Sequence, residues 1–431
     1  MKILKFGGTS VGSAARMKAV AELIADREQK IVVLSAMSGT TNALLQMAEY
    51  IRIGNASGAT DTLKELETKY RKECADLGIN YDLLQPMFTN LRRCCLQPFS
   101  PQIEKDIVSF GELISTTMMA AYMAQIGQDA VLMPALDFMR LNADGEPDLH
   151  ETERLLRQQL EHFGQHRYVI TQGFICRNAN GDIDNLKRGG SDYTASVIGA
   201  VLEAEEIQIW TDIDGMHNND PRYVEGTVPV RNLSFDEAAE LAYFGAKILH
   251  PTCILPAKMH NVPVRLLNTM DPKAPGTYID NHAISGTIKA IAAKDGIYAV
   301  RVQSDRMLMA YGFLSRVFEV FEKYRTSIDL ITTSEVAVSM SVDNNNQLDA
   351  ILAELRTFGT VSAEGNMTII SVVGDLRPDN NGLESLVIEA MKDIPIRMIS
   401  YGGSEHNISL LVASENKVRA LQALSQTLFP N

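Results

Sequence analysis

The sequence predicts an α/β protein in which a mostly parallel sheet is covered by helices and is followed by a pair of smaller α/β modules. Over the first two-thirds of the 431 residues, short apolar segments alternate with helix-like segments. Several of these apolar segments are continuous, which is typical of strands buried on both faces. After about residue 290, short strand–helix units recur in two blocks of similar order, which indicates a duplicated module.

The first region is expected to contain strands whose ends share a pattern. They are expected at residues 31–35, 130–134, 168–172, 207–211 and 262–267, with helices at 104–126, 192–205 and 234–249. Glycine follows several strand ends, at Gly7, Gly39, Gly173 and Gly215. In parallel sheets, ligands bind at the carboxyl ends of the strands. This shared placement therefore predicts a binding site at that edge of the sheet.

Composition excludes several classes of function. The net charge is −13 and there is no basic cluster, so nucleic acid and anionic membrane surfaces are not expected partners. The five cysteines form no C-x-x-C pair, which favours free thiols in a reducing compartment. No secretory signal pattern and no apolar run of about 18 residues is recognised, so a soluble cytoplasmic protein is expected.

The first chemical motif is Ile3-Leu-Lys-Phe-Gly-Gly-Thr-Ser-Val-Gly12. Gly7 and Gly8 remove side chains that would keep a polyanion away from the backbone N–H groups, and Lys5 supplies a positive charge. A helix capped by Ser13 should follow and present its N-terminus to the same anion. The alternative is a tight strand-to-helix turn with a solvated lysine.

The second motif is Leu186-Lys-Arg-Gly-Gly-Ser-Asp-Tyr-Thr194 before a clear helix. Arg188 carries a planar fork that matches a carboxylate, and Ser191 is expected to cap the helix. Asp192 is a candidate site residue. The alternative for Asp192 is an ordinary first-turn acid that complements the helix dipole.

Further polar groups complete a candidate phosphate and amino-acid site. Acidic and hydroxyl groups follow a strand in Trp210-Thr-Asp-Ile-Asp-Gly215, and Asp220-Pro-Arg222 comes after them. Lys247 lies beyond a helix that a Ser234–Glu237 capping box begins. Glu112 is expected near a helix start, and its carboxylate could bind the ammonium group of a substrate. Because no activated Ser, Cys or His nucleophile is evident, this set favours direct phosphoryl transfer.

The motifs taken together resemble the aspartokinase family over essentially the whole chain. They are Lys5-Phe-Gly-Gly-Thr-Ser10, Phe110-Gly-Glu-Leu113, Thr171-Gln-Gly-Phe174, Arg188-Gly-Gly-Ser-Asp-Tyr-Thr194, Trp210-Thr-Asp212, Asp220-Pro-Arg222 and Phe244-Gly-Ala-Lys-Ile-Leu-His-Pro251. The resemblance implies an amino-acid-kinase fold, an αβα sandwich, followed by two ferredoxin-like ACT domains. It implies ATP-dependent phosphorylation of the L-aspartate β-carboxylate to 4-phospho-L-aspartate. That reaction leads to lysine, threonine, methionine and diaminopimelate.

The resemblance also implies the roles of individual residues. Lys5 and Asp192 would be catalytic, and Ser35, Thr41, Glu112, Arg188 and Ser191 would surround aspartate. ATP would contact Lys5, Gly7, Gly8, Thr211, Asp212, His217, Arg222 and Lys247. His217 departs from the family, in which many members carry a tyrosine. Mg²⁺ would be held mostly by ATP oxygens and water, with no assigned protein ligand.

The C-terminal region resembles the regulatory part of lysine-sensitive aspartokinases. The resemblance implies a catalytic domain at 1–288, one ACT domain at 304–363 and a second at 289–303 plus 364–431. The implied effector residues are Met307, Gly312, Phe313, Leu314, Ser327, Asp329, Ser334 and Glu335. Lysine or threonine would be the effector. The chain would form a homodimer, or a dimer of dimers, through its ACT domains.

Two alternatives remain open at this point. One is an amino-acid sensor of the same fold whose kinase half is weak, against which Lys5, Arg188 and Asp192 argue. The other is a sibling kinase that acts on glutamate, acetylglutamate or UMP. The Phe110–Leu113 motif and the paired ACT modules favour aspartate over these substrates.

Overall fold

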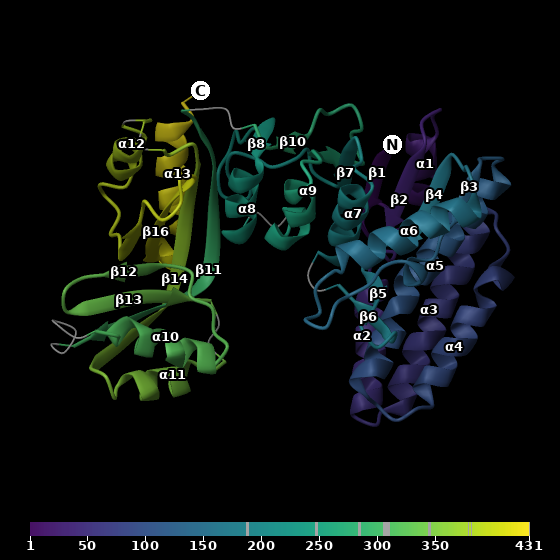
Figure 1. Cartoon of the computed structure of the whole chain (residues 1–431), viewed down its shortest axis with the longest axis horizontal. Coiled ribbons are helices and arrows are strands. Elements are labelled where there is room, and N and C mark those ends of the chain that lie inside the picture. The colour runs from purple at the N-terminus through teal and green to yellow at the C-terminus, as the bar shows by residue number, and fades with distance from the viewer. Residues whose placement is uncertain are drawn as a thin grey trace. The chain divides into compact units, whose positions relative to one another are not determined.

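The chain forms two compact units (Figure 1). The computed structural model describes residues 1–186, 189–245, 249–282, 286–304, 311–343, 346–377, 379–380 and 382–430. The first unit comprises Met1–Met216 and Ile248–Asn281, and the second comprises His217–Lys247 and His282–Asn431. The domain boundaries that the resemblance implies stay predictions.

The first unit is built on a mostly parallel sheet, which confirms the predicted fold class. Its strands follow the order β3-β4-β2-β1-β7-β9-β10, and only β10 runs antiparallel to its neighbour in this run. Every residue of β2 and β4 is buried, including the polar Lys30, Thr171 and Gln172 at their ends, as expected of central strands covered on both faces. The bounds are β1 Lys2–Phe6, β2 Lys30–Leu34, β3 Ala130–Leu132, β4 Tyr168–Gln172, β7 Glu206–Thr211, β9 Val264–Asn268 and β10 Thr277–Asp280. A separate hairpin pairs β5 Ile175–Arg177 with β6 Ile183–Asn185.

Helices cover this sheet. The helices between β2 and β3 in the chain, α2 to α5, are called the helical insertion below. Figure 1 shows α3, α4 and α5 side by side, and their buried residues join one apolar core. Ser13 accepts a hydrogen bond from the Arg16 N–H, so the predicted cap of α1 is confirmed. The bounds are α1 Ala14–Ile24, α2 Thr40–Arg52, α3 Ala56–Leu77, α4 Gln85–Cys95, α5 Pro101–Gln125, α6 Leu149–Phe163, α7 Gly190–Val201 and α9 Leu255–Met259.

Helix α5 is the one helix, among the residues described, that is long and apolar enough to cross a membrane. Of its most apolar window, 61% is buried inside the protein. The helix contacts β3 and β4 and packs along α2 and α4. Its apolar composition is therefore explained by a place in the core of the first unit.

The second unit contains an antiparallel sheet of the order β12-β13-β11-β14-β16-β15. Two long strands run through it, and a separate apolar core lies along each half. The strands of this sheet are β11 Ile288–Gln303, β12 Ile331–Thr333, β13 Ala337–Val342, β14 Thr360–Gly374, β15 Met398–Ser400 and β16 Asn407–Ala413. The second unit also contains β8 Asn232–Ser234, which lies outside this sheet. The helices are α8 Phe235–Tyr243, α10 Phe313–Lys323, α11 Leu348–Leu355, α12 Leu383–Ala390 and α13 Lys417–Leu428.

The segment before α8 belongs to the second unit. The predicted capping box is present, because Ser234 accepts from the Glu237 N–H and Glu237 accepts from the Ser234 N–H. Val224 is buried and joins the same apolar core as α12 and α13. The segment that follows Asp220-Pro-Arg222 is thus anchored by a buried side chain as well as by a helix start.

Candidate active site

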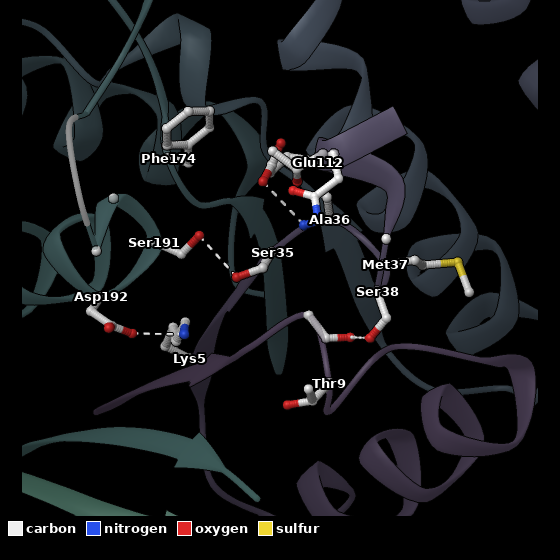
Figure 2. Close-up of a pocket in the computed structure, with 16 residues that line it drawn as sticks. Lys5, Thr9, Ser35, Ala36, Met37, Ser38, Glu112, Phe174, Ser191 and Asp192 are labelled. Atoms are coloured by element: carbon white, nitrogen blue, oxygen red, sulfur yellow. Dashed lines mark hydrogen bonds and ion pairs between the residues drawn. The ribbon is translucent and has the colours of Figure 1, made fainter. Parts of the chain in front are cut away.

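A cavity of about 500 Å³ opens in the first unit where β1 and β2 end and α7 begins. Strand β1 pairs in parallel with β2 and β7, so their carboxyl ends meet at one edge, as the glycine pattern predicts. Figure 2 shows the side chains around this cavity. The lining residues are Lys5, Gly8, Thr9, Ser35, Ala36, Met37, Ser38, Gly39, Thr41, Asn42, Glu112, Phe174, Gly189, Gly190, Ser191 and Asp192.

Lys5 and Asp192 form an ion pair at the cavity wall (Figure 2). The Lys5 Nζ lies 2.7 Å from the Asp192 Oδ1, and each side chain is only 12% exposed. Lys5 comes from the end of β1 and Asp192 from the first turn of α7. The Lys5 ammonium, held by Asp192 beside the N-terminus of α7, is a positive charge that can bind and orient a phosphate group.

Ser191 does not cap α7, so that prediction is wrong. The capping position is taken by Gly189, which has a φ of 71° in the left-handed region and makes no side-chain cap bond. Ser191 lies inside the helix and shares a 2.9 Å hydrogen bond with the Ser35 hydroxyl. The glycine pair moves the helix start back, because only glycine enters this backbone region without strain. The Ser191 hydroxyl is thereby released to the cavity.

Glu112 is a buried carboxyl group at the cavity. It lies in the middle of α5 rather than near a helix start, which corrects the sequence-based expectation. Its side chain accepts a 3.1 Å hydrogen bond from the Ala36 N–H through Oε1, while Oε2 is buried and has no partner among the described residues. Burial raises the pKa of Glu112 to about 7. Such a carboxyl group is suited to receive a cation from a ligand.

The glycines of the first motif serve different purposes. The Gly7 N–H donates to the Trp210 carbonyl at 3.4 Å, so it is used within the sheet, and Gly7 is not part of the cavity wall. Gly8 lines the cavity, and a Cβ there would approach the Ala36 carbonyl oxygen to 2.9 Å. Thr41, in the first turn of α2, also lines the cavity as predicted.

Comparison with known proteins identifies the family. Residues 1–268 match the amino acid kinase family, and residues 370–428 match an ACT domain. The chain is 34% identical to the chloroplastic aspartokinase 3 of Arabidopsis thaliana, over 99% of this chain and 81% of that protein. It is 32% identical to the lysine-sensitive aspartokinase 3 of Escherichia coli, over 99% of both. The chain belongs to the aspartokinase family.

A solved aspartokinase structure matches the whole fold. The crystal structure of E. coli aspartokinase III in complex with aspartate and ADP superposes with a TM-score of 0.84 and 32% identity, covering 100% of both chains. The match includes the parallel sheet and the antiparallel one. The aspartokinase resemblance read from the motifs is therefore confirmed.

The predicted nucleotide residues of this aspartokinase fall in both units. Thr211 ends β7 in the first unit, and its hydroxyl lies 3.2 Å from the Asp212 carboxylate. In the second unit, His217 Nδ1 lies 3.1 Å from the Thr227 hydroxyl. The Arg222 guanidinium binds Asp220 and lowers the pKa of that carboxyl group. Three predicted site residues, Arg188, Lys247 and Met307, lie outside the described residues.

The predicted effector residues lie around α10 and the strands next to it. Gly312 precedes α10 with a φ of 79°, and Phe313 is buried in the apolar core. The Asp329 carboxylate accepts from Tyr243 at 2.6 Å and from Lys294 at 2.8 Å, and its Oδ2 is buried without a partner among the residues described. The remaining described members are Leu314, Ser327, Ser334 and Glu335, and the Ser334 N–H bonds the Ala337 carbonyl.

Sequence reasoning assigned no role to three groups at the cavity, although Ser38 stands with Gly39 after a predicted strand end. Ser38 and Met37 line it from the loop between β2 and α2, and Phe174 lines it with a φ of 69°. Phe174 ends the Thr171-Gln-Gly-Phe174 motif, so its place at the cavity could have been predicted from the sequence. Lys69, on α3, bonds the Ser38 carbonyl, and no local pattern in the sequence connects these two residues.

Proposed function

We propose that the cavity of the first unit binds L-aspartate and the γ-phosphate of ATP, and that phosphoryl transfer to the aspartate β-carboxylate takes place there. The observation that carries this proposal is the placement of an ammonium and an ammonium-binding carboxyl group around one cavity. Lys5 supplies the first and Glu112 the second. Ser35 and Ala36, adjacent in the chain, bond Ser191 and Glu112 and so connect the two halves of the site.

The aspartate end of the cavity is built from Glu112 and hydroxyl groups. The Glu112 Oε2, buried and unpartnered among described residues, would receive the α-ammonium of aspartate. Ser35, Thr41 and Ser191 would donate to its carboxylates. Arg188 would bind a carboxylate through its planar fork, as the family motif implies.

The phosphate end is built from Lys5 and the N-terminus of α7. In the transfer, the β-carboxylate oxygen attacks the γ-phosphorus and the bond to the leaving ADP oxygen breaks. The Lys5 ammonium would stabilise the negative charge on the phosphoryl group during transfer, and Asp192 would hold that ammonium in position. Catalysis here requires positioning and charge stabilisation rather than a covalent intermediate.

ATP and Mg²⁺ complete the proposed site. Thr211, Asp212, His217, Arg222 and Lys247 would contact the nucleotide, by family resemblance. Mg²⁺, when bound with ATP, neutralises phosphate charge. The Asp192 carboxylate at the cavity wall is an oxygen donor of the kind that this cation takes.

A coupled assay of ADP release tests the function. We expect turnover with L-aspartate and ATP, and little or none with glutamate, acetylglutamate or UMP. Binding of an amino acid without ADP release would instead support a sensor of the same fold. Turnover with glutamate above that with aspartate would overturn the substrate assignment.

We further propose lysine as the regulatory ligand of the second unit, acting in an ACT-mediated dimer in the cytoplasm. Asp329, a buried carboxylate with an unpartnered oxygen among the described residues, supports a cationic effector. The named lysine sensitivity of the E. coli relative points the same way. Inhibition by lysine and indifference to threonine are expected in titrations, and light scattering should give a dimer or a dimer of dimers.

A further inference from the structure

Helix α3 reaches two loops of the active site through one face. Lys69, Tyr70 and Glu73 lie within about one turn of this helix. The Lys69 Nζ donates to the Ser38 carbonyl at 2.7 Å and lies 3.2 Å from the Thr40 hydroxyl. Ser38 lines the cavity. A residue of the helical insertion therefore holds the backbone of the loop that follows β2.

Ser38 also contacts the glycine-rich loop after β1 and so connects that loop to Lys69. Its hydroxyl donates to the Gly8 carbonyl at 2.8 Å. A Cβ on Gly12 would lie 2.6 Å from the Ser38 Oγ. The serine side chain thus occupies the space that a Cβ on Gly12 would take, and its hydrogen bond ties the loop after β2 to Gly8.

The same face of α3 makes two further contacts. The Tyr70 hydroxyl, fully buried, lies 2.8 Å from the Thr40 hydroxyl. The Glu73 carboxylate accepts from the Ala14 N–H at 2.6 Å, at the N-terminus of α1. These contacts fix the first turns of α1 and α2 against α3. The helical insertion is therefore a brace for both loops.

Partial burial makes the charged form of Lys69 less favourable than that of a lysine in full contact with water. Its side chain is partly buried, and burial lowers its pKa, an effect that the negative charge of nearby Glu73 opposes. Its nearest bonds, among the residues described, go to a carbonyl and a hydroxyl rather than to a carboxylate. A desolvated charge directed at a loop carbonyl is the expected form of a structural clamp.

We propose that Lys69 is a positioning residue for phosphoryl transfer, which acts by clamping Ser38 and, through it, the Gly8 loop. In this role Lys69 contacts neither aspartate nor ATP. The proposal rests on the proposed function, because the two loops it aligns carry the Lys5 and Ser35 side of the site. A misplacement of such loops by about 1 Å is enough to lower turnover by an order of magnitude or more.

The test compares Lys69→Met with Lys72→Met, a matched change on the same helix at a side chain that is 75% exposed. We expect kcat of Lys69→Met to fall roughly tenfold or more, with KM for ATP and aspartate within about threefold. Lys72→Met should match the wild type. Lys69→Arg, which keeps a donor, should recover part of the loss.

Hydrogen–deuterium exchange of residues 36–42 gives a readout independent of the substrate. Faster exchange there in Lys69→Met, and not in Lys72→Met, is expected even if the substrate assignment fails. Equal kcat and equal exchange in the two variants would overturn the proposal. If Lys69→Met does not fold, Ser38→Ala tests the second link, and an unchanged kcat in that variant also overturns it.

Discussion

The ammonium of Lys5 lies 2.7 Å from the carboxylate of Asp192, and both side chains are 12% exposed. The pair joins the end of β1 to the first turn of α7 across the cavity. Asp192 therefore holds Lys5 in a defined place before ATP arrives. A phosphate that enters meets an ammonium that is already oriented, so little reorganisation is needed during transfer.

We expect Lys5→Met to lower kcat by roughly a thousandfold, because a cation that follows charge on the transferring phosphoryl group is lost. Circular dichroism should show an intact fold. The matched control is Lys2→Met on the same strand, where the lysine pairs with Glu28 away from the cavity. A kcat for Lys5→Met within threefold of the control would contradict the phosphate role.

Binding of aspartate should weaken as the pH falls below neutrality. Burial raises the pKa of Glu112 to about 7, so the carboxylate needed for the substrate ammonium is lost below that pH. The expected result is a KM for aspartate that rises towards tenfold per pH unit below 7, with kcat at saturating aspartate changing less. Initial-rate measurements between pH 5.5 and 8.5 check this. A flat KM over that range would contradict the role of Glu112.

The same residue should cost stability above neutral pH. Because the folded-state pKa lies above its ordinary value of 4.5, the folded protein binds more protons than the unfolded chain between these values. The contribution of Glu112 to stability is therefore present at low pH and is lost as the pH rises through 7. We expect Glu112→Gln, which keeps the acceptor for the Ala36 N–H, to be more stable than the wild type at pH 8 by up to about 3 kcal/mol.

Denaturant titrations at about pH 4 and pH 8 measure this difference. At about pH 4, below the ordinary value of 4.5, the two proteins should be nearly equal. Glu65→Gln, at an exposed position of α3, should match the wild type at both values. A Glu112→Gln variant that is less stable than the wild type at pH 8 would contradict this prediction, because it would mean that the ionised carboxylate makes a stabilising contact in the folded protein. The gain in stability should come with a loss of aspartate turnover, as is common where function requires a strained group.

Local patterns in the sequence were sufficient for the parallel sheet and for most of the cavity. Continuous apolar runs specify buried strands, and glycine-rich segments mark the site edge, so Lys5 and Asp192 could be predicted to converge. Ser35 was assigned to the site only through the family resemblance. The helix starts were less predictable. The sequence offered Ser191 as a cap, yet the cap is Gly189, because a left-handed glycine can begin α7 two residues earlier.

Long-range contacts could not be predicted in this way. Glu112 was placed near a helix start, but the capping serine and proline at Ser100 and Pro101 begin α5 much earlier. The Lys69 contact with Ser38 depends on how α3 packs against the β2–α2 loop. No periodicity or local motif encodes that packing, since it is settled only when the helices of the insertion assemble.

Lys294 in the second unit pairs with two carboxylates. Its ammonium bonds Asp329 at 2.8 Å and Asp343 at 2.9 Å, and the Asp329 side chain is only 1% exposed. Lys294→Met would leave a buried carboxylate without its cation, so we expect a loss of about 3 kcal/mol in the free energy of unfolding. Lys323→Met is the matched control, because its pair with Glu354 is exposed and should contribute little. Chemical denaturation of both variants measures the effect. Equal stability would mean that Asp329 is compensated by Tyr243 alone, whereas a selective loss shows that Lys294 neutralises the carboxylate proposed to receive the effector.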